Sequence, residues 1–438
     1  MVRDREPMLP LGSFLFPEVF RAFRMSIQPT KLILAFMALA AVCLTGRLMD
    51  FHRTVVVGDD GITELDVYVA DGQVHEHIRL CEETGIKDGV FATLWNFGAR
   101  RFHDALKALA RPDVLGITRN TAACLEALVW AFQYHPLYSI IFFAVSLAML
   151  SLCGGAICRI AALQFAQGEK PGLTEAVHFA IRKFHSLVTA PITPIAIIAL
   201  IGVFIFLLGL VGNIPVLGEL SVGLFLPLAL MAAALIAIIA IGTLAGFNLM
   251  LPTIAYEDSD CFDAISRSFS YVYAKPWRMG FYTVAAAVYG AICYAFVRFF
   301  CYLLLQITRM FLQFGFLNEN EKLARIWPEP NFTDFLPATS TAPANWSTSA
   351  GAFLVYIWVV VVVGLMVSFV ISFYFSANTI IYALMRNRVD KTSLDEVYTG
   401  SDEMAAEAML AMPQPEAQTE PSNPPDQDQP DENSETSE

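Results

Sequence analysis

The sequence predicts an all-α polytopic membrane protein with six transmembrane helices, amphipathic interfacial helices and a small α+β extracytoplasmic insertion. A helix needs roughly 20 apolar residues to cross a bilayer core about 30 Å thick, and six segments approach that length. Continuous apolar runs such as that from Trp358 to Val363 lack the alternation of a membrane β-barrel. The six segments are 29–48, 137–158, 187–211, 222–247, 279–297 and 352–377.

Composition supports this class and excludes polyanionic partners. The chain is 56% apolar and only 16% charged, against about 25% charged residues in a soluble domain. Its net charge of −13 arises in residues 390–438, which hold 14 acidic residues and one lysine. The remainder balances 27 basic against 27 acidic residues. No basic field is left to attract nucleic acid, so we predict none as a partner.

The distribution of Lys and Arg predicts the orientation. Bases gather before the first segment, in alternate connections and after the last segment, whereas the short connection 212–221 has none. Because cytoplasmic loops retain Lys and Arg, both termini are expected in the cytoplasm of a bacterium, with the body in its inner membrane. No A-x-A site follows the first segment, so we expect no cleaved signal peptide.

The same pattern divides the chain into five parts. The predicted parts are a cytoplasmic N-terminus with an interfacial helix (1–28), a first transmembrane helix (29–48), an extracytoplasmic domain (50–136), a five-helix membrane domain (137–390) and an acidic, disordered cytoplasmic tail (391–438). The tail is rich in Pro, Glu, Asp, Gln and Ser, a composition that buries too little apolar surface to fold.

Segment 50–136 predicts a β-hairpin from 54–57 and 64–69, then a helix around 94–109. A second helix from about Thr118 is expected to continue into the second span. Cys81 and Cys124 leave open either a disulfide or two free thiols. His75-Glu76-His77 would place two imidazoles on one face of a strand. Zinc needs three or four ligands at characteristic spacing, so we predict solvated residues and no metal.

A cytoplasmic pattern recurs after the second, fourth and sixth spans, at Glu175, Asp263 and Asp395. Each copy begins with a polar residue, carries an acid in the first turn and then becomes amphipathic, as helices do at their N-termini. Such helices are expected to lie in the membrane interface. The repeated span–surface helix–span unit leaves two explanations open: an internal duplication, or local constraints shared by helices that leave a membrane.

The second copy, Cys261-Phe-Asp-Ala-Ile-Ser-Arg-Ser-Phe-Ser-Tyr-Val-Tyr-Ala-Lys-Pro-Trp-Arg278, resembles the signature of uncharacterised bacterial six-helix inner-membrane proteins. That set includes the membrane domain attached to some glycerophosphodiester phosphodiesterases. The resemblance covers roughly 137–390 and implies a fold rather than an activity. It transfers no catalytic residue, and no phosphodiesterase domain accompanies it here.

The positions of the ionisable residues favour contacts with lipid over a role in transport. The span cores contain no Asp, Glu, Lys or His. Lys31 is counted among the bases before the first span, and Arg47 lies at the edge of that span. This argues against a proton-coupled carrier. Arg298 and Arg309, beyond the fifth span, are candidates for binding lipid phosphate. Candidates for lipid headgroups on the cytoplasmic side are Arg182, Lys183 and Arg278.

Other features indicate packing and partners. Gly242 and Gly246 form a GxxxG pattern, which favours close helix contact either within the monomer or in a homodimer. The acidic tail and the extracytoplasmic domain are candidate sites for a protein partner. No sequence feature predicts a cofactor.

Enzyme motifs are absent from the sequence: it has no Walker A loop, G-x-S-x-G, H-E-x-x-H or C-x-x-C. We therefore expect a non-catalytic membrane module that organises protein partners or lipids. One alternative is a channel or facilitator for an uncharged or small solute. The other is a lipid-acting enzyme, which would need carboxylates or histidines clustered near the cytoplasmic bases.

Overall fold

The computed structural model describes residues 16–58, 61–70, 72–81, 86–316, 320–332, 335 and 345–398. Through Val397 these residues belong to one compact unit. The predicted acidic tail beyond Tyr398 lies outside the described residues.

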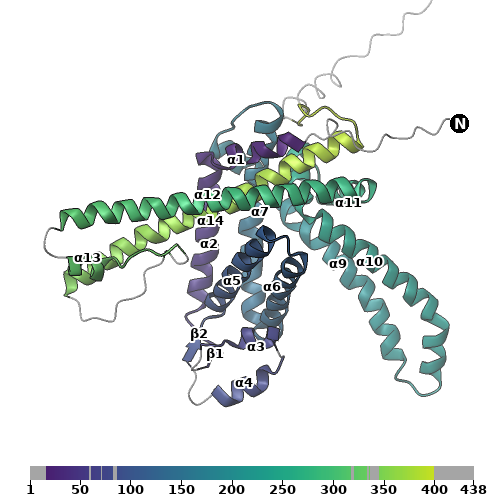
Figure 1. Ribbon diagram of the computed structural model, residues 1–438. Coiled ribbons are helices and arrows are strands. Elements are labelled where there is room, and N and C mark those ends of the chain that lie inside the picture. Colours follow the sequence, from purple (N-terminus) through teal and green to yellow (C-terminus); the bar gives the residue numbers. More distant parts are fainter. Residues whose placement is uncertain are drawn as a thin grey trace, which may run out of the picture. The chain divides into compact units, whose positions relative to one another are not determined.

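The prediction of six long apolar helices is confirmed, because the described residues contain six helices long and apolar enough to cross a membrane. Most extend past the predicted ends, since polar first and last turns continue the same helix outside the apolar stretch. They are α2 (Pro29–Met49), α7 (Pro136–Ala166), α9 (Phe184–Val211), α10 (Leu217–Glu257), α12 (Pro276–Gly315) and α14 (Trp346–Val389) (Figure 1).

The core forms where α7 packs against α2, α10 and α14. Buried side chains gather in the C-terminal halves of α7, α10 and α14 and at the start of α2. Glycine permits the close approach: a Cβ on Gly154 would lie 2.4 Å from the ring of Phe375 on α14. The helices are thus most closely packed at the end of the molecule where α2 begins and where α10 and α14 end.

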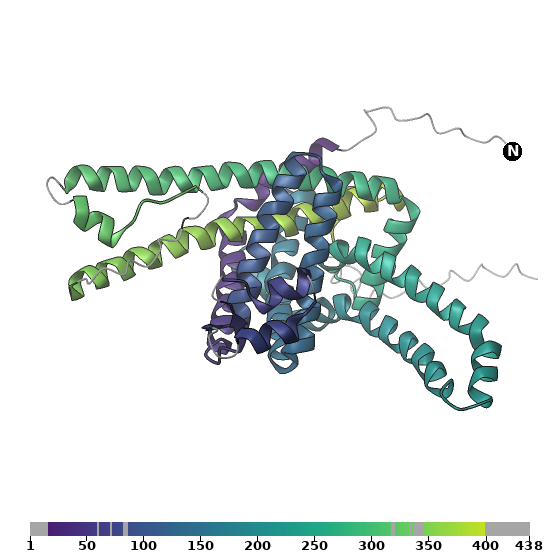
Figure 2. The ribbon, with the colours of Figure 1, turned by 60° about the horizontal axis from the view of Figure 1, so that its bottom comes forward.

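Two helix pairs, α9–α10 and α12–α14, extend away from this core in different directions (Figures 1 and 2). No residue is buried in the most apolar 18-residue stretch of α10, and only 6% of the corresponding stretch of α9 is buried. The α12–α14 pair is partly covered by the short helix α13 (Asn320–Ile326), which contacts α14. The most apolar stretches of α9 and α10 are therefore less buried than those of α12 and α14, of which 28% and 22% are buried.

Helices after the second and fourth spans are confirmed as α8 (Leu173–Arg182) and α11 (Cys261–Ala274). In α8 the small residues Ala176 and Ala180 are buried, whereas Ile181 remains exposed; the position of α8 in a membrane interface remains a prediction. Before the first span, η2 (Phe16–Phe20) and α1 (Arg21–Ser26) pack against α14.

The prediction of a third such helix near Asp395 is wrong for the described residues, because 391–398 is turn and irregular structure. The segment is held against the end of α14 instead. Asn387 donates to the carbonyl of Thr392 at 2.8 Å, and Arg386 donates to that of Glu396 at 2.6 Å. The side chain of Val397 is buried in the core. Contacts with α14 thus outweigh the local helix-start pattern.

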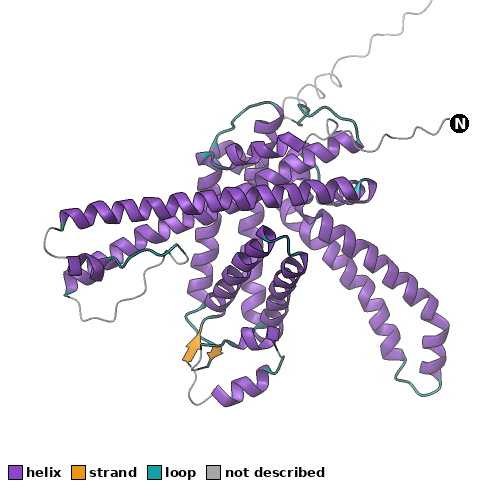
Figure 3. Ribbon diagram, viewed as in Figure 1, coloured by secondary structure: helices purple, strands orange, loops and turns teal. Residues whose placement is uncertain are grey.

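Segment 50–136 is mostly helical, with a two-stranded sheet of β1 (Val55–Val57) and β2 (Ile86–Asp88) paired antiparallel (Figure 3). The predicted pairing of 54–57 with 64–69 is wrong, because the second stretch is helix α3 (Glu64–Ala70). Thr63 caps this helix: its Oγ1 accepts from the backbone N–H of Asp66 at 3.2 Å and donates to the Asp66 carboxylate at 2.8 Å. Local capping therefore wins over the β-branched composition.

His75 and His77 lie in helix α4 (Val74–Cys81), so the predicted strand is wrong there too. Residues two apart in a helix do not share a face, and the pair therefore offers no chelating arrangement.

Among the described residues no group of three or more His, Cys, Asp or Glu side chains is placed to hold a metal ion. Cys81 and Cys124 are both free in this structure, and their pairing remains an open alternative of the sequence.

The helix predicted around 94–109 is confirmed as α5 (Val90–Ala110). The helix predicted to continue into the second span is interrupted, however: α6 (Val114–Tyr134) ends before His135, and Pro136 begins α7. Proline restricts the residue before it to extended backbone and is suited to the first position of a new helix. The α5–α6 pair folds back, so that α5 contacts α2 and α6 contacts α7.

We predict that Gly154→Ala lowers the free energy of unfolding by about 1–3 kcal/mol, because the added methyl would overlap the Phe375 ring. The matched control is Gly202→Ala on α9, where nothing lies within 4 Å of an added Cβ. Alanine there should stabilise the helix slightly. Unfolding of both variants in detergent checks this; equal effects would contradict the packing.

Candidate functional site

Helix α10 ends on two adjacent acids, Glu257 and Asp258, which we call the α10 hub. Asp258 follows the last helical residue in a left-handed conformation, with φ 53°, which Asp tolerates better than most residues. The C-terminus of a helix carries a partial negative charge, so acids there require compensating cations. The hub obtains these cations from three other helices and the start of α9.

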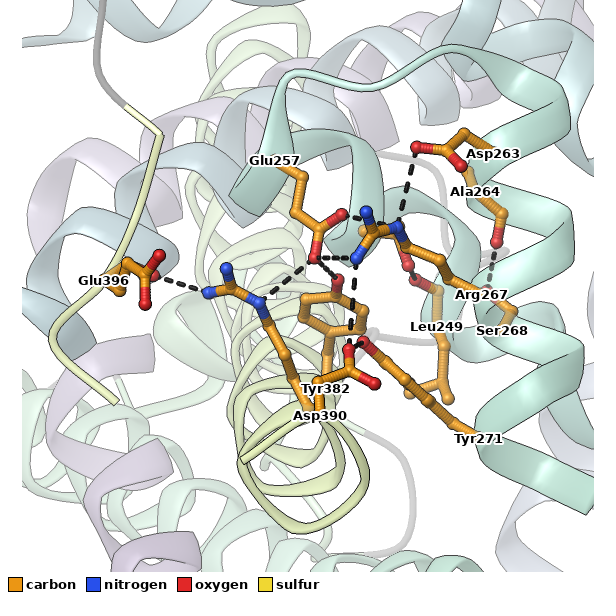
Figure 4. A network of polar contacts seen from close by, with 12 residues as sticks. Leu249, Glu257, Asp263, Ala264, Arg267, Ser268, Tyr271, Tyr382, Asp390 and Glu396 are labelled. Atoms are coloured by element: carbon orange, nitrogen blue, oxygen red, sulfur yellow. Dashed lines mark hydrogen bonds and ion pairs between the residues drawn. The ribbon is translucent and has the colours of Figure 1, made fainter. Parts of the chain in front are cut away.

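Glu257 binds two arginines at once (Figure 4). Arg267 of α11 contacts both carboxylate oxygens, at 2.8 and 3.0 Å, and Nε of Arg386 from α14 lies 3.1 Å from Oε1. The buried hydroxyl of Tyr382 donates to the same oxygen at 2.6 Å. With both oxygens engaged by cations or a hydroxyl, the carboxylate is positioned as a clamp rather than as a free acid or base.

A second layer ties α11 to the end of α14. The hydroxyl of Tyr271 donates to Asp390 at 2.5 Å, and Arg267 lies within 3.9 Å of the same carboxylate. Burial and the Asp390 carboxylate raise the pKa of Tyr271. Burial acts to lower the pKa of Arg267, but Glu257 and its other acceptors raise it overall. Both groups therefore keep their protons at neutral pH.

Asp258 connects the end of α10 to the junction of α8 and α9. Its carboxylate lies 2.9 Å from Arg182 at the end of α8 and 3.2 Å from Lys183. Lys183 also donates to the Asp258 carbonyl at 2.6 Å, and Arg159 of α7 donates to the carbonyl of Ala255 at 2.9 Å. These bases thereby satisfy the carbonyls that the end of a helix leaves without intrahelical partners.

The three residues predicted to bind lipid headgroups differ in their contacts. Arg182 and Lys183 contact Asp258, whereas the side chain of Arg278 forms no ion pair or hydrogen bond within the described part of the chain. Arg278 follows Trp277, which is 90% exposed at the start of α12. An exposed Trp beside an Arg is typical of a membrane interface. Binding of lipid headgroups by the three bases remains a prediction.

Arg298 and Arg309, the predicted lipid-phosphate residues, both reach the segment after α13. Arg298 is buried; it donates to the carbonyl of Phe332 at 2.8 Å, and its guanidinium also contacts His103 of α5. Arg309 donates to the carbonyl of Trp327 at 3.3 Å. The sequence suggested no such partners, since each lies 18 or more residues away along the chain. Lipid binding by these arginines remains a prediction.

Gly242 and Gly246 face α11 in this chain. A Cβ on Gly242 would lie 3.1 Å from the Phe269 ring, and one on Gly246 would lie 3.4 Å from Ser268. The GxxxG pattern therefore supports a contact within the monomer, where it seats α11 beside the hub.

Lys31 is the functional candidate that sequence reasoning missed. Counted with the bases before the first span, it lies instead in the first turn of α2 with no exposed surface. Its ammonium donates to Gln164 of α7 at 2.8 Å. The signal was available, because Lys31 falls two residues inside the first apolar segment. The prediction that the span cores contain no lysine is therefore wrong for α2.

Comparison with protein-family models, with curated proteins and with solved structures gives no significant match. The resemblance of 261–278 to six-helix inner-membrane proteins remains a prediction.

We predict that Glu257→Gln lowers the free energy of unfolding by roughly 3 kcal/mol, because two arginines lose the charge that compensates them. The control is Asp104→Asn, which removes an exposed pair with Lys107 and should cost less than about 1 kcal/mol. Denaturant titration in detergent measures both; a loss no larger than the control's would contradict the clamp.

For Lys31, we predict that Gln164→Leu destabilises the protein by about 1–3 kcal/mol, because the buried ammonium loses its acceptor. The double variant Lys31→Met with Gln164→Leu should recover most of that loss, since an apolar pair replaces the buried charge. The same unfolding measurement on the natural chain, on both single variants (Gln164→Leu and Lys31→Met) and on the double variant checks this. Additive losses would show that the two side chains are uncoupled.

Proposed function

We propose that the protein is a non-catalytic module of a bacterial inner membrane that binds the transmembrane helices of other proteins through its α9–α10 pair. The observation that carries this proposal is the apolar surface of that pair. No residue is buried in the most apolar stretch of α10, and Leu244 is 79% exposed. In the hub, by contrast, the end of the same helix is clamped to α11 and α14.

The surface of α9–α10 suits protein helices as well as lipid. Helix association in a bilayer depends on small residues that let backbones approach. Gly202 and Gly209 on α9 and Gly223 on α10 have open space where a Cβ would lie. The chain's own helices fill the corresponding space at Gly154, Gly242 and Gly290. The pair therefore offers small-residue positions that the monomer leaves unfilled.

The orientation belongs to the same proposal. Arg182, Lys183, Arg386 and Arg388 all lie at the end of the molecule where α10 and α14 finish. Cytoplasmic loops retain such bases, which supports a cytoplasmic hub, cytoplasmic termini and an extracytoplasmic place for the α3–α4 region. The hub bears on the enzyme alternative too: the carboxylate beside Arg182 and Lys183 is Asp258, and these bases already neutralise it.

The test is native mass spectrometry of the gently extracted full chain beside a Gly202→Leu/Gly209→Leu variant. We expect a membrane-protein partner at fixed stoichiometry with the natural chain and its loss with the variant, because two large side chains would fill the open positions. The matched control is Gly98→Leu on α5, where the space is likewise open.

Deletion of 399–438 separates the two candidate partner sites. Retention of the partner by the truncated chain supports binding through α9–α10, whereas its loss would assign the partner to the tail. A chain that carries no partner under any of these conditions would contradict the proposed function.

A further inference from the structure

A surface pocket of about 400 Å³ lies where α2 ends and α5 begins. This volume is within the range of small-ligand sites. Its lining comes from the C-terminal turn of α2, the connection to β1, and the junction of β2 with α5. The lining residues are Arg47, Asp50, Phe51, Arg53, Asp88, Gly89 and Ala92.

The length of α2 places this pocket at the level of lipid headgroups. The helix has 21 residues and at 1.5 Å per residue is about 31 Å long, which matches one bilayer core. If Pro29 lies at one interface, Met49 lies at the other, and the pocket follows directly. Leu44 and Leu48 are exposed on one face of α2 below it, and Phe51 beside it is 87% exposed. An apolar track thus leads from the membrane interior to the pocket.

The Asp50 carboxylate in the pocket already has hydrogen-bond partners within the protein. Asp50 accepts from the backbone N–H groups of Phe91 and Ala92 at 2.9 Å each, and from the hydroxyl of Tyr138 at 3.3 Å. Gly89 makes this cap possible, because a Cβ there would lie 2.1 Å from the Asp50 carboxylate. The N-terminus of α5 and the Asp50 carboxylate are therefore occupied with each other.

Charges of both signs remain for a ligand. The guanidinium of Arg47 lies 6.0 Å from the centroid of the Phe91 ring, and neither Arg47 nor Arg53 forms an ion pair within the described ranges. Asp88 accepts from the backbone N–H of Gly89 through one oxygen, at 2.8 Å. Its second oxygen has no hydrogen-bond partner among these residues. The pocket thus presents two guanidinium groups and one carboxylate oxygen.

We propose that this pocket binds the zwitterionic headgroup of an aminophospholipid such as phosphatidylethanolamine, with the phosphate at Arg47 and Arg53 and the ammonium at Asp88. Guanidinium groups match the oxygens of a phosphate, and a primary ammonium has three N–H donors for a carboxylate. Choline has no N–H donor, and a glycerol headgroup brings no positive charge to Asp88. The site is separate from the α9–α10 surface and does not depend on the partner proposed there.

The test titrates the full detergent-solubilised chain with lipids of matched acyl chains and reads the bound lipid by native mass spectrometry. We expect phosphatidylethanolamine to bind at least about tenfold more tightly than phosphatidylcholine or phosphatidylglycerol, because a charge-assisted hydrogen bond is worth about that factor. Arg53→Gln should weaken the binding by a similar factor. Asp88→Asn should remove the preference for phosphatidylethanolamine over phosphatidylcholine.

The matched control is Arg119→Gln, an exposed arginine on α6 outside the pocket, which should leave binding unchanged. Equal affinity for the three lipids would overturn the proposal, as would an Arg53→Gln variant that binds like the natural chain. Tighter binding of phosphatidylglycerol would indicate a plain anion site. Soluble O-phosphoethanolamine bound as tightly as the lipid would overturn the assignment to a membrane lipid.

Discussion

The ion pairs of Glu257 and Asp258 are the interaction on which the arrangement of the membrane helices depends. Inside a bilayer no hydrophobic force drives helices together, so long apolar helices need specific contacts at their ends or at small residues. The α10 hub supplies such contacts to α8, α9, α11 and α14 within two consecutive residues. Because each acid is matched by cations from other elements, removal of either acid would leave partly buried charges unpaired.

The hub also explains why the two surface helices resemble each other in sequence. Arg182 ends α8 and Arg267 lies within α11, and both bases reach the same end of α10. A surface helix that connects the end of one span to the start of the next lies at the same end of the molecule as the ends of the other spans. Because both copies face this environment, a shared local constraint explains the recurring first-turn acid and later base as well as an internal duplication does.

Periodicity and length were enough to predict the six apolar helices, α5, α8 and α11, because each of these depends on a local pattern. The hub was not predictable in this way: Arg386 meets Glu257 across 129 positions of chain, and no local pattern records that pairing. The errors in segment 50–136 have a different cause. Thr63 and Asp66 form a capping pattern that starts α3, and this local cap outweighs the β-propensity of the valines in 64–69.

Helix α2 shows how polar residues set the depth of an apolar helix. Lys31 at its start is enclosed and bonded to Gln164, so it cannot extend toward water, whereas Arg47 near its end is exposed. The two residues are 16 positions apart, or about 24 Å along the axis, less than the thickness of a bilayer core. With Lys31 held in place by α7, only the Arg47 end can adjust to the headgroups. The pocket at that end therefore lies where a lipid phosphate can satisfy the charge that the chain itself leaves unpaired.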